Sequence, residues 1–208
     1  MIRVDPARCQ VTDLAAAGEW LRAGGIVAYP TDTFYGLAVD PTQAAAVADL
    51  FDLKGRDPGV AMPLIASSTA QVLGIVQAID QASSRLAETF WPGPLSLVLN
   101  AGSQVAPAVH AGRHTLAVRV PAHRVARALA ETCPLPITAT SANRSAAPPV
   151  SSSDELGDLG RDRRVLVIDA GRTPGGLPST IVDARGAEPR LVREGAIPWN
   201  RVLDCLKG

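Results

Sequence analysis

The sequence predicts a fold of the α/β type in the broad sense (mixed α+β). In this fold a sheet with both parallel and antiparallel strands is flanked by helices. Segments with helical periodicity are interspersed along the chain with short aliphatic runs that are typical of strands. Near the C-terminus two such runs, residues 180–183 and 190–193, follow each other like the arms of a hairpin. A mixed sheet fits this order better than a strictly parallel one.

Five segments carry the signals of helices. In the first, residues 11–23, apolar side chains recur at helical spacing, Thr12 or Asp13 can cap the N-terminus, and Gly24 with Gly25 ends the helix. The predicted helices are residues 11–23, 44–53, 82–90, 121–129 and a last one from residue 199.

Eight short runs are predicted as strands. Pro30 stops the first of them. The alternation within residues 115–120 places Arg119 on the face opposite Leu116 and Val118, where a charge that faced the core would need a partner. The predicted strands are residues 26–29, 63–66, 95–100, 115–120, 137–140, 165–168, 180–183 and 190–193. Residues 145–153 are predicted as a flexible surface loop that could cover a site.

Length and composition favour one domain spanning residues 1–208. The chain is 47% hydrophobic and 19% charged, which is ordinary for a folded soluble protein. It contains no run of 18 apolar residues and begins without a hydrophobic signal core, so we expect a cytoplasmic protein with no membrane contact. Cys9, Cys133 and Cys205 lack metal-ligand spacing, which argues against a disulfide framework and against a zinc site.

The formal net charge is zero, but the second half of the chain is the more basic one. Residues 1–100 hold 6 basic and 10 acidic side chains, and residues 101–208 hold 14 and 10. The later half can therefore supply cations to an anionic ligand. Lys54 is the only lysine besides Lys207, and it precedes Arg56 by two residues. This pair suggests a site that uses a compact ammonium beside a planar guanidinium.

Three separated segments each join an apolar run to a cluster of hydroxyls, amides or cations. They are residues 28–37 with the cations at 54 and 56, residues 137–143, and the glycine-rich residues 169–180. We expect them to hold one anionic, phosphate-bearing ligand. The structural alternatives stay open for each: a capped turn at 31–35, a helix N-cap at 140–143, dipole-stabilised cations at 54 and 56, and a plain surface loop at 171–179.

The remaining candidates fit a site that works by charge. Arg119 and Arg193 lie in strand-like segments, and either they end in solvent or both point into one anion-filled cavity. No serine–histidine–acid order, glutamate pair or thiolate motif competes as a catalytic centre. Such a site would act by positioning and charge neutralisation.

Six motifs, in family order between about residues 11 and 198, resemble the YrdC-like family. They are YPTDTFYGL at 29–37, KGR at 54–56, FWPGPL at 90–95, AVRVP at 117–121, SAN at 141–143 and PSTIVD at 178–183. Within this family the chain is similar to the short-form L-threonylcarbamoyladenylate synthases, which lack an additional C-terminal domain.

The resemblance implies a reaction in which L-threonine, bicarbonate and ATP give threonylcarbamoyl-AMP and pyrophosphate. It implies an open, twisted sheet with a concave, positively charged cavity, and Mg²⁺ carried with ATP. The product would pass to tRNA-modifying proteins that complete threonylcarbamoyladenosine, with at most a weak direct contact to tRNA.

The resemblance also implies roles for single residues. Lys54 and Arg56 would be the catalytic cations. The implied threonine-binding residues are Thr33, Arg119, Ala139 and Ser179, and the implied ATP-binding residues are Arg56, Thr115, Ser141, Asn143 and Arg193. Many relatives carry a histidine where Ser67 stands here, and the connection 57–62 is longer than usual, so no ligand role is assigned to that stretch.

Two other functions compete with this interpretation. One is a non-catalytic RNA- or tRNA-binding module, against which the even charge balance and the scarce aromatic residues argue. The other is a carbamoyl-adenylating domain that acts on carbamoyl phosphate, although such domains normally sit in a longer chain with zinc-binding cysteines.

Overall fold

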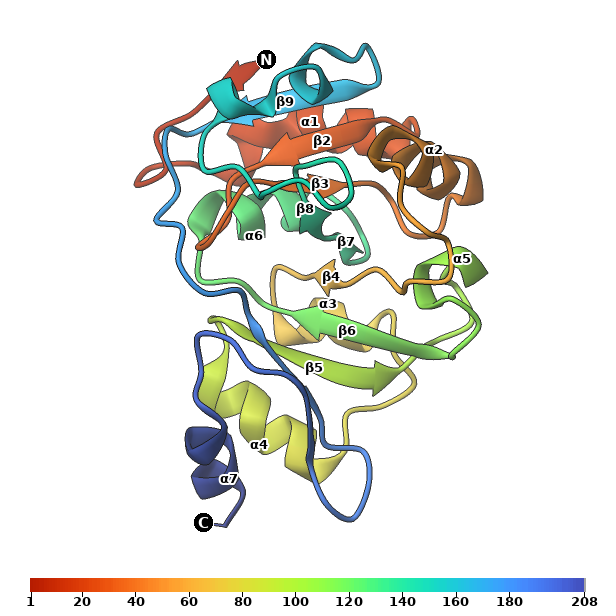
Figure 1. Cartoon of the computed structure of the whole chain (residues 1–208), viewed down its shortest axis with the longest axis vertical. Helices are drawn as coiled ribbons and strands as arrows, with labels where there is room; N and C mark the ends of the chain where they lie inside the picture. The colour runs from red at the N-terminus through yellow and green to blue at the C-terminus, as the bar shows by residue number, and fades with distance from the viewer. Residues whose placement is uncertain (208) are drawn as a thin grey trace.

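The computed structural model describes residues 1–207 and divides the strands between two mixed sheets, one above the other in Figure 1. The upper sheet has the order β1 (Ile2–Arg3), β9 (Val165–Asp169), β2 (Ile26–Tyr29), β3 (Gly36–Ala38) and β8 (Thr140–Ser141). The lower sheet has the order β11 (Arg190–Arg193), β10 (Thr180–Asp183), β5 (Leu95–Asn100), β6 (Thr115–Arg119), β4 (Leu64–Ile65) and β7 (Ile137–Thr138).

Both sheets combine parallel and antiparallel pairs, which confirms the predicted mixed fold, although the sequence predicted a single sheet and the structure has two. In the upper sheet β2 pairs in parallel with β9 and antiparallel with β3. In the lower sheet β5 pairs antiparallel with β6 and in parallel with β10. The predicted C-terminal hairpin is the antiparallel pair of β10 and β11.

Helices cover the sheets, and all five predicted helices are present; the last begins at the predicted residue 199, and the others have shifted ends. The α-helices are α1 (Ala15–Arg22), α2 (Ala44–Lys54), α3 (Thr69–Leu73), α4 (Gln81–Phe90), α5 (Pro107–His110), α6 (Arg124–Glu131) and α7 (Trp199–Lys207), and short 3-10 turns occupy Val11–Leu14, Ser153–Leu156 and Leu159–Arg161. None of the helices in residues 1–207 combines the length and the apolar character that a membrane crossing requires.

Two predicted helix starts were wrong. The first helical segment is capped by Gln10 rather than Thr12 or Asp13, because the Asp13 carboxylate accepts the Gln10 backbone N–H at 2.8 Å. The helix predicted from Pro121 begins only at Arg124, after an extended His123. The short elements β1, β3, α3 and α5 were not predicted, because segments of two to five residues are too short to show a period.

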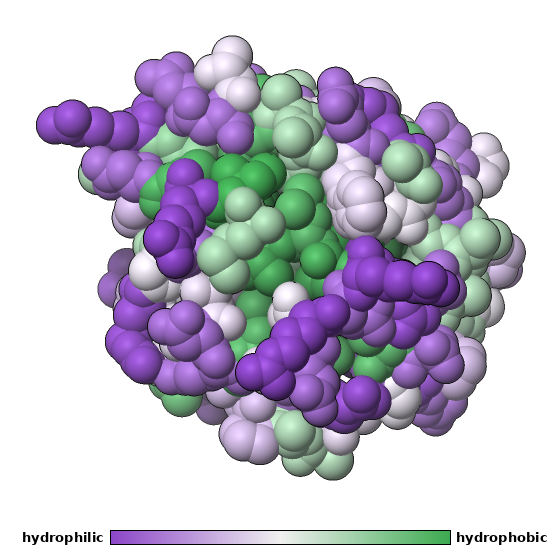
Figure 2. Space-filling model, turned by 90° about the horizontal axis from the view of Figure 1, so that it is seen from above, coloured by the Kyte–Doolittle hydropathy of each residue, from purple (hydrophilic) through white to green (hydrophobic). Residues whose placement is uncertain are grey.

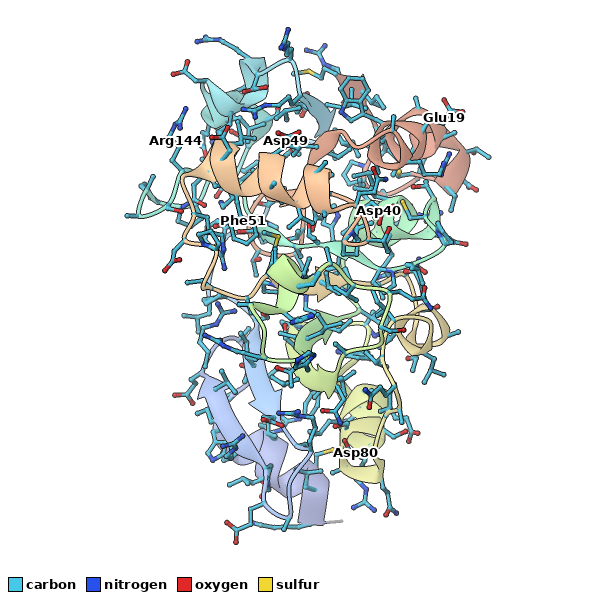
Figure 3. All side chains as sticks on the ribbon, turned by 90° about the vertical axis from the view of Figure 1, so that its right-hand side faces the viewer. Glu19, Asp40, Asp49, Phe51, Asp80 and Arg144 are labelled. Carbon is cyan, nitrogen blue, oxygen red and sulfur yellow. The ribbon has the colours of Figure 1, made fainter. Side chains whose placement is uncertain are left out.

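The apolar interior lies on both faces of the upper sheet. Ile26 and Ala28 of β2 belong to the larger core cluster, which continues through α2 into the lower sheet. Val27 and Tyr29 belong to a second cluster that α1 and α6 cover. Figure 3 shows Phe51 and Asp49 on opposite sides of α2, in agreement with a buried phenyl ring and an exposed carboxylate.

The surface at the end of the molecule that carries β9 contains both apolar and hydrophilic residues (Figure 2). Seen from above, apolar residues gather in its middle and hydrophilic residues surround them (Figure 2). Val165 and Leu166 of β9 are only partly buried. This end of the upper sheet is therefore thinly covered.

The chain crosses from the lower to the upper sheet at Ala139, where one continuous strand was predicted over residues 137–140. Ile137–Thr138 pairs with β4 and Thr140–Ser141 pairs with β3. The crossing is held by the Ala139 N–H, which donates to the Pro63 carbonyl at 2.7 Å, and by the Thr138 hydroxyl, which accepts the Val39 N–H at 2.8 Å. Residues from the two sheets meet at this point.

A candidate anion-binding cavity between the two sheets

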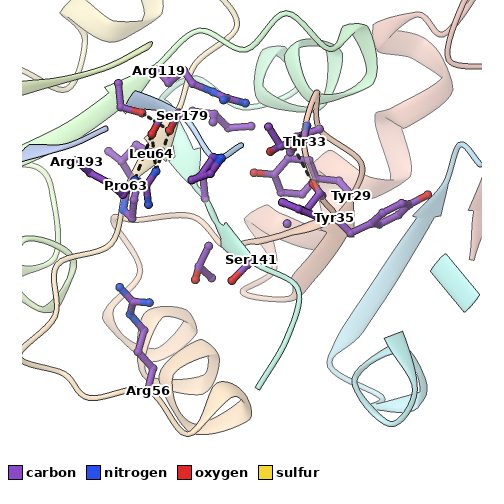
Figure 4. Close-up of a pocket in the computed structure, with 18 residues that line it drawn as sticks. Tyr29, Thr33, Tyr35, Arg56, Pro63, Leu64, Arg119, Ser141, Ser179 and Arg193 are labelled. Atoms are coloured by element: carbon purple, nitrogen blue, oxygen red, sulfur yellow. Dashed lines mark hydrogen bonds between the residues drawn. The ribbon is translucent and has the colours of Figure 1, made fainter. Parts of the chain in front are cut away.

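A cavity of about 260 Å³ opens where the sheets meet, and both sheets contribute to its wall (Figure 4). The upper sheet supplies the end of β2, the following turn, β3 and β8. The lower sheet supplies β4, β5, β6 and β11. The wall consists of Tyr29, Thr31, Thr33, Phe34, Tyr35, Gly36, Arg56, Pro63, Leu64, Ile65, Ser96, Arg119, Ala139, Thr140, Ser141, Pro178, Ser179 and Arg193.

The cavity brings together most of the residues that the sequence singled out. Those that line it are Thr33, Arg56, Arg119, Ala139, Ser141, Ser179 and Arg193. Three arginines therefore face one space, and the described wall contains no aspartate or glutamate. Of the two alternatives left open for Arg119 and Arg193, both side chains line the shared cavity, and Arg193 is at the same time exposed to solvent.

Arg119 sits at the end of β6 and is paired with Asp32 from the turn after β2. The Arg119 side chain is 8% exposed and that of Asp32 is 18% exposed. One guanidinium nitrogen, Nη2, donates to the carboxylate oxygen Oδ1. Val118 points the other way into the core, as the predicted alternation requires. Asp32 thus orients a cation whose remaining N–H groups are available to a ligand.

Arg193 reaches the cavity from β11 and holds the Ser179 segment. Its Nη2 donates to the Ser179 carbonyl at 2.8 Å and to the Ser179 hydroxyl at 3.1 Å, and this hydroxyl lies 3.1 Å from that of Ser96. Gly195 lets the chain pass this close, since a Cβ there would lie 2.2 Å from the Pro178 carbonyl oxygen. Burial, and then the charge of Arg119, lowers the pKa of Arg193.

Arg56 follows the left-handed Gly55 that ends α2, and its guanidinium is only partly paired. Nη2 donates to the Ala61 carbonyl at 3.0 Å, so the connection 57–62 helps to position this side chain. Its Nε is buried and has no hydrogen-bond partner among the described residues. Burial lowers the pKa of Arg56, against the opposing charge of Asp57.

Lys54 does not line the cavity, although the sequence suggested that it would face the same ligand as Arg56. It is the last residue of α2 and only 3% exposed. Its ammonium donates to the Ser141 carbonyl, to the Asn143 carbonyl at 2.6 Å and to Asn143 Oδ1 at 3.4 Å. In this structure Lys54 holds the segment that carries Ser141 against the end of α2.

The buried ammonium of Lys54 predicts a pH dependence of stability. Burial, and then the charge of Arg56, lowers the pKa of Lys54 from 10.5 to about 8. Between these two values the unfolded chain binds more protons than the folded one, so this group makes the protein more stable as the pH rises. We expect the difference in unfolding free energy between wild type and Lys54→Met to grow in favour of wild type from pH 8 to pH 10.5, as measured by urea unfolding. A difference that stays constant would contradict the depressed pKa.

Two further predicted ligands also lie outside the wall. Thr115 is four residues before Arg119 at the other end of β6, which is roughly 13 Å away at the rise of a strand. Asn143 follows β8, where its side chain contacts the Ser141 hydroxyl and the Ala147 carbonyl. Their predicted roles toward ATP remain predictions.

The glycine-rich segment 169–180 meets the cavity only through Pro178 and Ser179. The Tyr35 hydroxyl donates to the Gly171 carbonyl at 2.8 Å, and the Gly175 N–H donates to the Thr33 carbonyl at 2.8 Å. The Gly175 N–H is thus used to join this glycine-rich segment to the first segment. The loop 145–153, which was predicted to cover the site, is also hydrogen-bonded to the first segment, because the Tyr35 N–H donates to the Val150 carbonyl at 2.9 Å.

Several cavity residues were missed from the sequence. Tyr29 and Thr31 lie inside the first motif, which was the signal that could have found them. Ser96 carried no signal, because a serine within an aliphatic strand has no distinctive pattern. Asp32 was seen only as part of a turn, because its partner Arg119 is 87 residues away. Within residues 1–207 no three potential metal-ligating side chains cluster together.

The fold and the cavity define an α+β protein whose two mixed sheets enclose an arginine-lined cavity. A family model of Sua5, YciO and YrdC proteins, described as "Telomere recombination", matches residues 19–195. The chain belongs to this family, as its motifs predicted.

The similar proteins include enzymes and solved structures. Threonylcarbamoyl-AMP synthase from Pyrococcus abyssi is 34% identical over 195 residues, which are 94% of this chain but 57% of that protein. The synthase from Thiobacillus denitrificans is 38% identical over 164 residues, which are 79% of this chain and 87% of that protein. The crystal structure of P. abyssi Sua5 complexed with L-threonine matches with a TM-score of 0.90 at 32% identity, covering 99% of this chain and 59% of that one. The chain therefore spans less than two thirds of the P. abyssi relative and most of the T. denitrificans one.

Proposed function

We propose that the protein is a threonylcarbamoyl-AMP synthase. The observation that carries the proposal is the convergence of Arg56, Arg119 and Arg193 from three separate segments on one cavity without a carboxylate in its described wall. Three cations in such a space suit a ligand set with several negative charges, such as an amino-acid carboxylate and a triphosphate. The named relatives and the solved complex with L-threonine support this choice of substrates.

The wall suggests two ends for the bound substrates. At one end Arg119, oriented by Asp32, would anchor the threonine carboxylate through its free N–H groups, with Thr33, Ala139 and Ser179 around the amino acid. At the other end Arg56 and the Ser141 hydroxyl would face phosphate oxygens. Arg193 lies beside Ser179 and could bridge the two ends. Lys54 would support the phosphate end by holding Ser141 in place.

The proposed chemistry needs little proton transfer by the protein. The threonine amine combines with bicarbonate to a carbamate, with loss of water. A carbamate oxygen then forms a bond to the α-phosphorus of ATP, and the bond from this phosphorus to the β-phosphate bridging oxygen breaks, releasing pyrophosphate. Arg56 would stabilise the charge that builds up on the phosphate oxygens, and the cavity would hold the reacting groups in contact.

We also propose that Mg²⁺ enters with ATP. The described wall offers hydroxyls but no carboxylate, and Asp32 is engaged by Arg119. This donor set fits an ion held mainly by phosphates and water, which Mg²⁺ accepts readily. When bound, the ion would neutralise phosphate charge. The product would pass to proteins that modify tRNA, which makes the cytoplasm the expected place of the reaction.

One assay tests the proposal against its rivals. Purified protein with ATP, Mg²⁺ and bicarbonate should release pyrophosphate only when L-threonine is present. A non-catalytic RNA-binding module would release none, and an enzyme acting on carbamoyl phosphate would respond to that compound but not to threonine. Either of these results would overturn the proposal.

A further inference from the structure

The Tyr29 hydroxyl is a buried polar group at the cavity, inside the first motif, to which neither the resemblance nor the proposed function assigns a role. The residue is 0% exposed, it lines the cavity, and its Oη has no hydrogen-bond partner among the described residues. Tyr35 is also fully buried, but its hydroxyl donates to the Gly171 carbonyl at 2.8 Å. Figure 4 shows both tyrosines at the cavity, together with Thr33. A buried hydroxyl is rarely left without a partner, so the Tyr29 hydroxyl points to a ligand atom.

The packing around Tyr29 fixes where this hydroxyl can point. Tyr29 ends β2 and lies directly opposite Gly36 in β3. A Cβ at Gly36 would come within 3.1 Å of Tyr29 Cζ and 3.2 Å of Tyr29 Oη, so the ring lies against the glycine backbone. Any larger residue at this position would press on the ring. The glycine thus lets the tyrosine lie flat with its hydroxyl at the cavity.

The hydroxyl shares its surroundings with the Arg119–Asp32 ion pair. Burial raises the pKa of Tyr29 strongly, while the charge of Arg119 lowers it and that of Asp32 raises it. The phenol is therefore protonated at neutral pH and can donate a hydrogen bond. It lies at the end of the cavity where Arg119 would anchor a carboxylate.

A count of charges explains why a carboxylate there needs a second donor. Arg119 already neutralises Asp32, so a bound carboxylate would place two negative groups on this cation, while the neighbouring Arg193 is hydrogen-bonded to Ser179. A neutral O–H donor beside the guanidinium would stabilise the second carboxylate without adding charge. The protonated Tyr29 hydroxyl meets this requirement.

We propose that Tyr29 is a substrate-binding residue whose hydroxyl donates a hydrogen bond to the carboxylate of the amino acid that Arg119 anchors. The inference rests on the proposed function, because it takes L-threonine as the amino acid. Tyr29 would supply a hydrogen-bond donor to the carboxylate in addition to the residues that already have a proposed role.

Calorimetric titration of the full chain with L-threonine, and separately with L-2-aminobutyrate, tests the inference. L-2-aminobutyrate keeps the carboxylate and the methyl group but lacks the hydroxyl. We expect Tyr29→Phe to bind both amino acids about 10- to 100-fold more weakly than wild type, as the loss of a hydrogen bond to a charged group predicts. Its thermal unfolding without ligand should occur at or above the wild-type temperature, because the hydroxyl has no partner to lose.

Tyr35→Phe is the matched comparison for stability. It removes a hydroxyl that is bonded within the protein, so this variant should unfold at a lower temperature than Tyr29→Phe. The opposite order would identify the Tyr29 hydroxyl as structural and overturn the inference.

The binding results separate this inference from the proposed function. If wild type binds threonine and Tyr29→Phe binds it equally well, the role of Tyr29 is wrong and the proposed function stands. If only threonine binding weakens, Tyr29 contacts the side-chain hydroxyl and the carboxylate assignment is wrong. If wild type binds no threonine, the proposed function is overturned and the inference falls with it.

Discussion

Arg119→Met is expected to raise the KM for L-threonine by about 100- to 1000-fold while the KM for ATP changes by no more than a few-fold. Truncating one member of a buried, hydrogen-bonded charge pair typically costs about 2 to 5 kcal/mol, because the other member is left unpaired. Arg119 is 8% exposed and pairs with Asp32. Without it, a bound carboxylate would lose its proposed anchor and would also face the Asp32 carboxylate. Pyrophosphate release at varied threonine concentrations measures the effect.

A double variant separates these two causes. In Arg119→Met with Asp32→Asn the repulsion between Asp32 and the ligand disappears, so part of the lost affinity should return, although the anchor is still missing. Arg161→Gln is the matched control, since this arginine is 82% exposed and pairs only with Asp158 in the neighbouring turn. Its kinetics should equal those of wild type. An unchanged KM for threonine in Arg119→Met would refute the proposed anchor.

Arg56→Met is expected to act on kcat rather than on threonine binding. Removing a well-placed donor to developing charge typically costs about 2 to 4 kcal/mol, which is about a 30- to 1000-fold loss of rate. Arg56 offers a buried Nε without a described partner, and Ala61 occupies only one of its other nitrogens. Steady-state pyrophosphate release should show the drop in kcat, and calorimetry without ATP should show threonine affinity close to that of wild type.

The conservative variant shows whether charge or shape is needed at this position. Arg56→Lys keeps a positive charge but loses the planar fork, so its kcat should lie between those of wild type and Arg56→Met. If Arg56→Met weakened threonine binding and left kcat intact, Arg56 would belong to the amino-acid end and the proposed division of the cavity would be wrong.

The two ends of the cavity depend on one topological feature, the crossing of the chain between the sheets at Ala139. The β7–β4 pair belongs to the lower sheet and the β8–β3 pair to the upper one. Because the crossing lies in the cavity wall, Ser141 of the upper sheet comes to the same space as Arg119 and Arg193 of the lower sheet. The site is thus built by the junction of the sheets rather than by one loop.

Most regular elements could be predicted from the sequence because their signals are local. Residues 26–29, 95–100, 180–183 and 190–193 were predicted with the bounds that the structure has, since each is an aliphatic or alternating run that glycine, proline or charged residues delimit. The single strand predicted at 137–140 was wrong, because a crossing between sheets leaves no mark on the hydrophobic pattern. It is decided by tertiary hydrogen bonds that the backbone N–H groups of Ala139 and Thr138 donate to the carbonyls of Pro63 and Val39.

In the candidate site, too, the sequence predicts which residues are charged but not which of them reach the cavity. Lys54 and Arg56 are two residues apart and carry the same charge, so the sequence predicts the same role for both. The helix places the Lys54 ammonium on the carbonyls of residues 141 and 143, and the left-handed Gly55 then turns the chain so that Arg56 reaches the cavity. The two side chains differ because Lys54 is still in the helix, Arg56 follows the end of the helix, and the distant segment 141–143 lies next to Lys54.

The sequence by itself determined the mixed fold class, the family and the motifs that meet in the cavity, because periodicity, turn residues and short motifs are properties of neighbouring residues. Only the tertiary structure decided which polar groups face the ligand space and which ones bond to each other. That choice depends on pairs such as Asp32 with Arg119 and Lys54 with Ser141, whose members are each 87 residues apart. Such pairs form only when packing of the two sheets brings the segments together, and no local pattern encodes the outcome.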